Sequence, residues 1–222
     1  FLWRCEAMPP ALNMAWDEVL LDCALHLEKP ILRFYAWAQP AGTFGYFQKY
    51  ETVQNLTGLR PLIRRPTGGG FVPHDNDWTY SLVIPSRHAW YTMAAGSTYA
   101  RIHWWLHLAF KLLGLQTRLA PHQQDGRGSC FAGTARFDLL FNERKIAGAA
   151  LRRTRHCILA QGSVQPLPFF PDRAEFEAAL QIVGRGHLGI EWEFWTPTND
   201  LIGKANTLAT HKYSSDSYNK VR

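Results

Sequence analysis

The sequence predicts an α+β fold in which a mixed β-sheet is flanked by helices. Two long segments, residues 11–28 and 96–113, carry apolar side chains at helical spacing. Shorter segments rich in β-branched and aromatic residues, bounded by Gly and Pro turns, indicate strands. The two kinds of segment do not alternate regularly, which argues against a βαβ fold. We expect the helices on one side of the sheet, and a single domain over residues 1–222, because neither a linker nor a repeat interrupts the chain.

The composition is that of a globular chain with a basic surface. Of the 222 residues, 46% are hydrophobic and 19% are charged, and the formal net charge is +6. This balance excludes a disordered protein, and the lack of any run of about 18 apolar residues argues against a membrane span. The positive charge favours anionic partners, either acidic proteins or nucleotides and nucleic acid. Four cysteines without a CxxC pair favour reduced thiols, so we expect a cytoplasmic protein.

The first predicted helix, residues 11–28, turns Asp17, Glu18 and Asp22 toward solvent and is stopped by Pro30. The second, residues 96–113, ends at Gly114. His103 and His107 lie one turn apart on it, but no third ligand follows at a suggestive spacing, so we interpret them as packing or surface residues. The predicted strands cover residues 31–37, 42–47, 62–65, 78–84, 136–141, 144–151 and 157–164. A short helix over 171–180, an irregular stretch over 184–206, and a short helix or tail over 210–222 complete the prediction.

The segment RRPTGGGFVPHD, residues 64–75, is the most informative motif from local chemistry. Three successive glycines allow positive φ and leave their backbone N–H groups open, so they can form a nest for an anionic or polar ligand. Alternation along an extended chain turns only one of Arg64 and Arg65 toward that ligand. The alternative is a flexible turn, but a hairpin turn needs only one or two glycines, which favours binding.

Cys130 and Lys145 form a second candidate constellation. Cys130 lies in the Gly-rich loop 121–135, where nearby arginines raise the thiolate fraction of a cysteine. Lys145 lies in a strand whose alternation places it on one face with Ala147 and Ala149. Gly148 in the middle of this strand marks a close approach of another group. Lys145 is either a surface lysine of a hairpin or, if it faces a cavity, a base whose neutral form burial favours. GxxxxGK[ST], GxSxG and HExxH are absent from the sequence.

Several of these segments resemble, in the same order, the lipoate–protein ligase A and octanoyltransferase family. RRPTGGGFVPHD is similar to its RRxSGGG…HD motif, ALNMAWDEVLL to its opening helix, and FDLLFNERKIAGAALRR to its lysine-bearing hairpin. ILRFYAW…GYFQ and HCILAQGSV resemble further strands, and the resemblance covers residues 11–168. It implies a mixed sheet flanked by helices, shared with the biotin ligase catalytic domain.

The resemblance implies transfer of an octanoyl or lipoyl group to a lysine of a lipoyl carrier domain. Ligases of the family activate free lipoate with ATP and Mg as an acyl-adenylate, whereas one group of octanoyltransferases moves octanoyl from acyl carrier protein onto a cysteine and needs no cofactor. SCFAGTARFDLL resembles the cysteine-bearing loop of that group, so the transferase is favoured and the ligase is the alternative. A basic nucleic-acid-binding module ranks last, because the aromatic residues follow core patterns.

The resemblance also implies the site residues. Cys130 and Lys145 would be catalytic, and no metal site is expected. The substrate-binding set would comprise Tyr35, Arg65, Gly68, Gly69, Gly70, Phe71, His74, Asp75, Gly148 and Ala149. The implied partners are acyl carrier protein and the lipoyl domains of 2-oxoacid dehydrogenases or the glycine cleavage H-protein. We expect a monomer with neither membrane nor nucleic acid as a partner.

Overall fold

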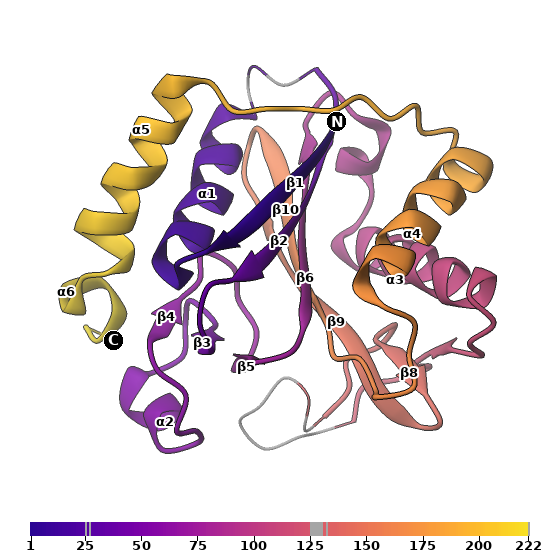
Figure 1. The fold of residues 1–222 in the computed structure, drawn as a ribbon, viewed down its shortest axis with the longest axis horizontal. Coiled ribbons are helices and arrows are strands. Elements are labelled where there is room, and N and C mark those ends of the chain that lie inside the picture. Colours follow the sequence, from indigo (N-terminus) through magenta and orange to yellow (C-terminus); the bar gives the residue numbers. More distant parts are fainter. Residues whose placement is uncertain (25, 27, 125–130, 132, 222) are drawn as a thin grey trace.

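A computed structural model describes residues 1–24, 26, 28–124, 131 and 133–221, and it has the predicted mixed sheet flanked by helices (Figure 1). The large sheet has seven strands in the order β1-β2-β6-β10-β9-β8-β7, and a small sheet has the order β4-β3-β5. In the large sheet β1 runs parallel to β2 while the remaining neighbours are antiparallel. The strands are β1 (Leu2–Met8), β2 (Ile31–Trp37), β3 (Ala41–Phe44), β4 (Leu62–Arg64), β5 (Val72–His74), β6 (Trp78–Pro85), β7 (Arg118–Leu119), β8 (Leu139–Phe141), β9 (Arg144–Arg153) and β10 (Cys157–Val164). The helices are α1 (Pro10–Cys23), α2 (Tyr50–Gln54), η1 (Ala89–Thr92), α3 (Ala95–Leu112), α4 (Arg173–Leu188), α5 (Asn199–Leu208), η2 (Ala209–Tyr213) and α6 (Asp216–Asn219).

The helices cover both faces of the large sheet, so the expectation of helices on one side was wrong. Figure 1 shows α1 and α5 against one face and α3 and α4 against the other. The central strands carry apolar side chains on both faces of the sheet. Leu82 and Ile84 of β6 join the core beneath α3 and α4, whereas Val83 joins the core beneath α1 and α5. A strand that is apolar on both sides requires cover on both sides.

Two helix predictions differ from the structure. The first helix ends at Cys23 instead of residue 28, and Asp17 is fully buried, not solvated. The helix predicted over 171–180 begins at Arg173, where Asp172 and Glu175 form a capping box, and it continues to Leu188. Glycines within its second half conceal the helix from a pattern-based prediction, since glycine is a poor helix former.

Elements near both ends of the chain were missed. The N-terminal strand β1 was not predicted, although it pairs with β2 along the edge of the large sheet. Within the stretch predicted to be irregular, residues 199–208 form α5, which packs on α1. The last stretch contains η2 and the short helix α6, and Figure 1 shows it beside α1 and β4. Among the described helices, none is long and apolar enough to cross a membrane.

Candidate active site

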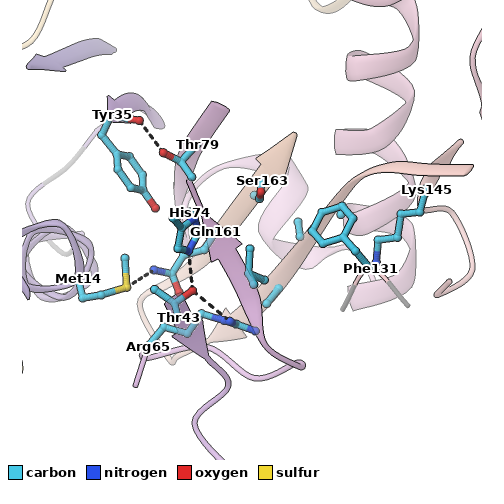
Figure 2. A pocket seen from close by; sticks show the side chains of 15 residues that line it. Met14, Tyr35, Thr43, Arg65, His74, Thr79, Phe131, Lys145, Gln161 and Ser163 are labelled. Atoms are coloured by element: carbon cyan, nitrogen blue, oxygen red, sulfur yellow. Dashed lines mark hydrogen bonds between the residues drawn. The ribbon is translucent and has the colours of Figure 1, made fainter. Parts of the chain in front are cut away.

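A narrow central cavity of about 40 Å³ lies between the two sheets (Figure 2). It is bordered by residues of β2, β3, β5, β6, β9 and β10, together with Met14 of α1, Arg65 and Phe131. Six of the residues that the resemblance implied border it: Tyr35, Arg65, His74, Lys145, Gly148 and Ala149. Figure 2 shows Lys145 and Phe131 together at one side of this cavity and Met14, Thr43 and Arg65 at the other.

The glycine run and Asp75 lie outside the lining of the central cavity. Of the described residues that border the central cavity, none belongs to the stretch from Gly68 to Phe71, and Asp75 is an exposed residue. The carbonyl oxygens of Gly68 and Gly70 each accept a hydrogen bond of 2.7 Å from Arg65 Nη2. These two carbonyl oxygens thus hold the guanidinium group of Arg65. Phe71 is buried in a separate core cluster with Phe44 of β3, Leu62 of β4 and Val53 of α2.

The two arginines of the motif point in opposite directions, as strand alternation predicts. Arg65 borders the central cavity and is 4% exposed, and its Nη1 donates to Thr43 Oγ1 at 3.3 Å. Arg64 is fully buried on the other side of β4, among backbone carbonyl groups of Tyr46 and Asn219. Only Arg65 is therefore positioned to interact with a group in the cavity.

His74 is held in one orientation by hydrogen bonds at both ring nitrogens. Its Nε2 lies 2.8 Å from Thr43 Oγ1, and its Nδ1 lies 2.8 Å from Asp77 Oδ2. Ser163 donates to the same oxygen of Asp77 at 2.6 Å. The ring of His74 is stacked on Trp37 with centroids 3.9 Å apart. Asp77, the hydrogen-bond partner of His74 Nδ1, was missed because the sequence favoured Asp75, which directly follows His74.

A second buried network supports the floor of the cavity from α1. Asp17 accepts hydrogen bonds from Arg33 at 2.8 Å, from Ser81 at 2.7 Å and from Gln161 at 2.6 Å. Burial raises the pKa of Tyr35, whose hydroxyl lies 3.5 Å from Asp17, so this phenol stays protonated at neutral pH. The network orients Gln161, which borders the central cavity. A helical pattern alone assigns Asp17 to solvent, and only the packing of α1 on the sheet reveals this role.

Lys145 is anchored at the opposite side of the cavity by a buried carboxylate. Its Nζ lies 2.7 Å from Asp138 Oδ2, and the side chains are 7% and 0% exposed. Asp138 also accepts hydrogen bonds from the Ala135 N–H and from the Tyr99 hydroxyl. Tyr99 in turn accepts a hydrogen bond of 3.2 Å from the Ala149 N–H. Burial, followed by the nearby Asp138, raises the pKa of Tyr99, which keeps it a hydrogen-bond donor.

The alternation expected for β9 is broken by a bulge. Leu139 pairs with Ala147 but Leu140 pairs with Lys145, so one residue of β9 is unmatched. Lys145 therefore shares its side of the strand with Gly148, and not with Ala147, which is buried in the core. A Cβ on Gly148 would lie 2.7 Å from Lys145 Cε and 2.9 Å from Nζ. The glycine thus makes room for the lysine to fold across the strand, which is the close approach that the sequence indicated.

Cys130 lies outside the described residues. Phe131, which follows it in the chain, borders the central cavity, and Lys145 Nζ lies 5.0 Å from the centroid of its ring. Within the part of the chain that the structure describes, no group of three or more His, Cys, Asp and Glu side chains could hold a metal ion.

The curated proteins that are similar to this chain include octanoyltransferases called LipM. The chain is 36% identical over 172 residues to the one from Geobacillus kaustophilus, covering 70% of this chain and 61% of the relative. It is 36% identical over 162 residues to the one from Oceanobacillus iheyensis, covering 69% of this chain and 59% of the relative. The aligned part thus spans about three-fifths of the length of these relatives.

Solved structures share the fold. A lipoate-protein ligase A bound with ATP has a TM-score of 0.81 at 24% identity, covering 99% of this chain and 97% of that one. A bi-partite lipoate protein ligase from Thermoplasma acidophilum, described together with its E2 lipoyl domain, has a TM-score of 0.76 at 22% identity, covering 99% and 95%. A biotin acetyl coenzyme A carboxylase synthetase from Helicobacter pylori has a TM-score of 0.51 at 12% identity, covering 92% and 79%. The expected fold, shared with biotin ligases, is therefore confirmed.

The family is established by a match to a domain model as well as by these similarities. The model describes the lipoyl protein ligase A/B catalytic domain and matches residues 9–184, which include both arginines of the motif and Lys145. The chain belongs to the lipoyl protein ligase A/B catalytic domain family.

Proposed function

We propose that this protein is an acyltransferase that moves an octanoyl group from acyl carrier protein, through a thioester on Cys130, to a lysine of a lipoyl domain. The observation that carries the proposal is the Lys145–Asp138 ion pair on the wall of the central cavity, next to the residue that follows Cys130. The two LipM relatives are octanoyltransferases, which favours the same donor chemistry here. The fold match to a ligase that is described with its E2 lipoyl domain favours a lipoyl domain as acceptor.

The ion pair defines what Lys145 contributes. In the ion pair with Asp138, the ammonium group of Lys145 is a hydrogen-bond donor and a positive charge. A fixed donor of this kind stabilises the negative oxygen of a tetrahedral intermediate. The backbone N–H of Ala149, a second potential donor, is bonded to Tyr99. Lys145 is therefore the group that we assign to the developing oxyanion.

The reaction then has two acyl transfers. The Cys130 thiolate attacks the carbonyl carbon of the octanoyl thioester, and the thiolate of the carrier leaves. The amine of the acceptor lysine next attacks the acyl-Cys130 carbonyl, the C–S bond breaks, and the amine proton goes to the departing Cys130 sulfur. Lys145 donates to the carbonyl oxygen in both steps, while Asp138 keeps the ammonium group in place. Neither step requires a cofactor.

Intact mass spectrometry tests the covalent step. After incubation with octanoyl-acyl carrier protein, the protein should gain the mass of one octanoyl group, and Cys130→Ser should gain none. Cys23→Ser is the matched control, because Cys23 lies on α1 and does not border the central cavity. The proposal fails if Cys130→Ser transfers octanoyl to a lipoyl domain at the full rate.

The ligase alternative makes a different prediction. A ligase uses octanoate with ATP and Mg, releases AMP and does not need a cysteine nucleophile. Transfer from octanoyl-acyl carrier protein should therefore be compared with transfer from octanoate plus ATP, with AMP measured in parallel. AMP release that accompanies transfer would replace the transferase with the ligase. The net charge of +6 suits an acidic carrier protein in either case.

A further inference from the structure

A segment beyond the matched family domain contacts Arg64, the first arginine of the motif. We call residues 209–219, which form η2 and α6, the C-terminal strap. The family model ends at residue 184, so the match assigns no role to this strap. Figure 1 shows it beside the small sheet and the end of α1.

Arg64 is the point at which the strap meets β4. Its guanidinium donates to the carbonyl oxygens of Tyr218 at 3.2 Å and Asn219 at 3.0 Å. On its other side it donates to the carbonyl oxygens of Tyr46 and Gln48, both at 2.7 Å. Arg64 is 0% exposed. A buried cation needs its hydrogen bonds satisfied, so the carbonyl groups of the strap are required for this position of the arginine.

Asn219 connects the strap to the backbone of the same strand. Its Oδ1 accepts a hydrogen bond of 2.8 Å from the Arg64 N–H. Its Nδ2 donates to the carbonyl oxygens of Tyr213 at 2.8 Å and Ser215 at 3.1 Å, which closes the turn of the strap. One side chain thus satisfies a backbone donor of β4 and fixes the shape of the segment that holds Arg64.

The next residue in the chain is Arg65, which borders the central cavity. Its backbone N–H donates to Phe44 at 3.0 Å, and its guanidinium holds the carbonyl groups of Gly68 and Gly70. A displacement at Arg64 is passed to Arg65 through one rigid peptide unit. The position of Arg65, and of the glycine turn bound to it, therefore depends on contacts that the strap makes.

The strap is also fixed to α1. Lys212 Nζ lies 2.7 Å from both carboxylate oxygens of Glu18, and the Tyr213 hydroxyl donates to one of them at 2.5 Å. Glu18 follows Asp17, which holds Gln161 on the cavity floor. The strap thus links α1, which contributes Met14 to the cavity wall, to β4, which ends immediately before Arg65.

We propose that the C-terminal strap is a positioning element of the active site, and that it acts through Asn219 and Arg64 on Arg65. For turnover the proposal rests on the octanoyltransferase function, but its effect on the cavity does not depend on which acyl transfer occurs. Arg64 and Asn219 are positioning residues, because neither borders the central cavity.

Two substitutions at residue 219 separate positioning from stability. Asn219→Ala and Asn219→Asp both lose the bonds to Tyr213 and Ser215, but only the alanine variant loses the acceptor for the Arg64 N–H. We expect both to lower the melting temperature. At a temperature at which both are folded, Asn219→Ala should lose up to about 10²-fold in kcat, the loss that a displacement of about 1 Å can cause, and Asn219→Asp should keep most of its kcat. Lys220→Ala is the control, since its pair with Asp216 is exposed.

Hydrogen exchange and octanoate binding supply readouts that do not depend on the reaction. The amides of residues 64–70 should exchange faster in Asn219→Ala than in Asn219→Asp. Octanoate should raise the melting temperature of Asn219→Ala by less than it raises that of Asn219→Asp. The proposal is overturned if kcat falls equally in the two variants in step with stability, or if Asn219→Ala exchanges and binds octanoate like Asn219→Asp. If the unsubstituted protein does not transfer octanoyl, the proposed function fails, and exchange and octanoate binding still decide the role of the strap.

Discussion

A double-mutant cycle on Lys145 and Asp138 tests the central feature of the site. The two side chains are almost fully buried and their charged atoms lie 2.7 Å apart. Removing one partner of a buried ion pair typically costs about 3–5 kcal/mol, because the other charge is left without compensation. Lys145→Met and Asp138→Asn should therefore each lower the free energy of unfolding by that amount. For a chain of this size, the corresponding fall in melting temperature is about 6–20 °C.

The double variant should be more stable than either single variant. It buries no unpaired charge, and the amide introduced by Asp138→Asn keeps a hydrogen-bonding oxygen for the Ala135 N–H, which lies 2.6 Å from Asp138 in the unsubstituted protein. We expect a coupling energy of about 2 kcal/mol or more, within the range seen for residues of one network. Urea unfolding of the four proteins measures this coupling. If the loss of unfolding free energy in the double variant equals the sum of the losses in the two single variants, the two charges are not coupled.

Activity should not recover with stability in this cycle. The loss of one oxyanion donor lowers kcat by about 10²–10³. Lys145→Met and the double variant should both show this loss in transfer from octanoyl-acyl carrier protein, although the double variant is the more stable of the two. A folded Lys145→Met protein with the kcat of the unsubstituted enzyme would refute the assignment of Lys145 to the oxyanion.

The remaining predictions concern a buried histidine and two glycines. Burial lowers the pKa of His103 from 6.5 to about 4, so the unfolded chain binds the proton more tightly, and stability should fall as the pH decreases from 6.5 toward 4. The decrease in the free energy of unfolding attributable to this residue is about 3 kcal/mol. Urea unfolding at pH 7 and at pH 4.5 should show that His103→Phe loses less stability on acidification than the unsubstituted protein. An equal loss in the two proteins would contradict the burial argument. Gly148→Ala should lower kcat strongly, because its Cβ would collide with Lys145, whereas Gly68→Ala, with no heavy atom within 4 Å of its Cβ, should retain activity. Equal activity of the two glycine variants would show that the packing of Lys145 over β9 is not needed.

The sequence determined those elements whose pattern is local. Strand β10 has the predicted bounds, and β2 likewise begins at Ile31 and ends at Trp37. The α3 helix differs from its prediction by one residue at each end. In these segments the periodicity, the turn residues and the tertiary environment agree, so a pattern in the sequence suffices. The motif segments also identified the family, which the match to the domain model confirmed.

Tertiary structure decided which side chains work together. Lys145 was a candidate from the sequence. Its partner Asp138 directly precedes β8, and Tyr99, which donates to Asp138, lies on α3. No sequence spacing predicts that these three residues meet. The bulge in β9 reversed the parity on which the predicted orientation of Lys145 depended. Asp17 was assigned to solvent because helical spacing describes one helix at a time, whereas its burial follows from the sheet packed against it. Local patterns are set by interactions within a few residues, and a site assembled from distant segments is set by packing, which only the folded chain contains.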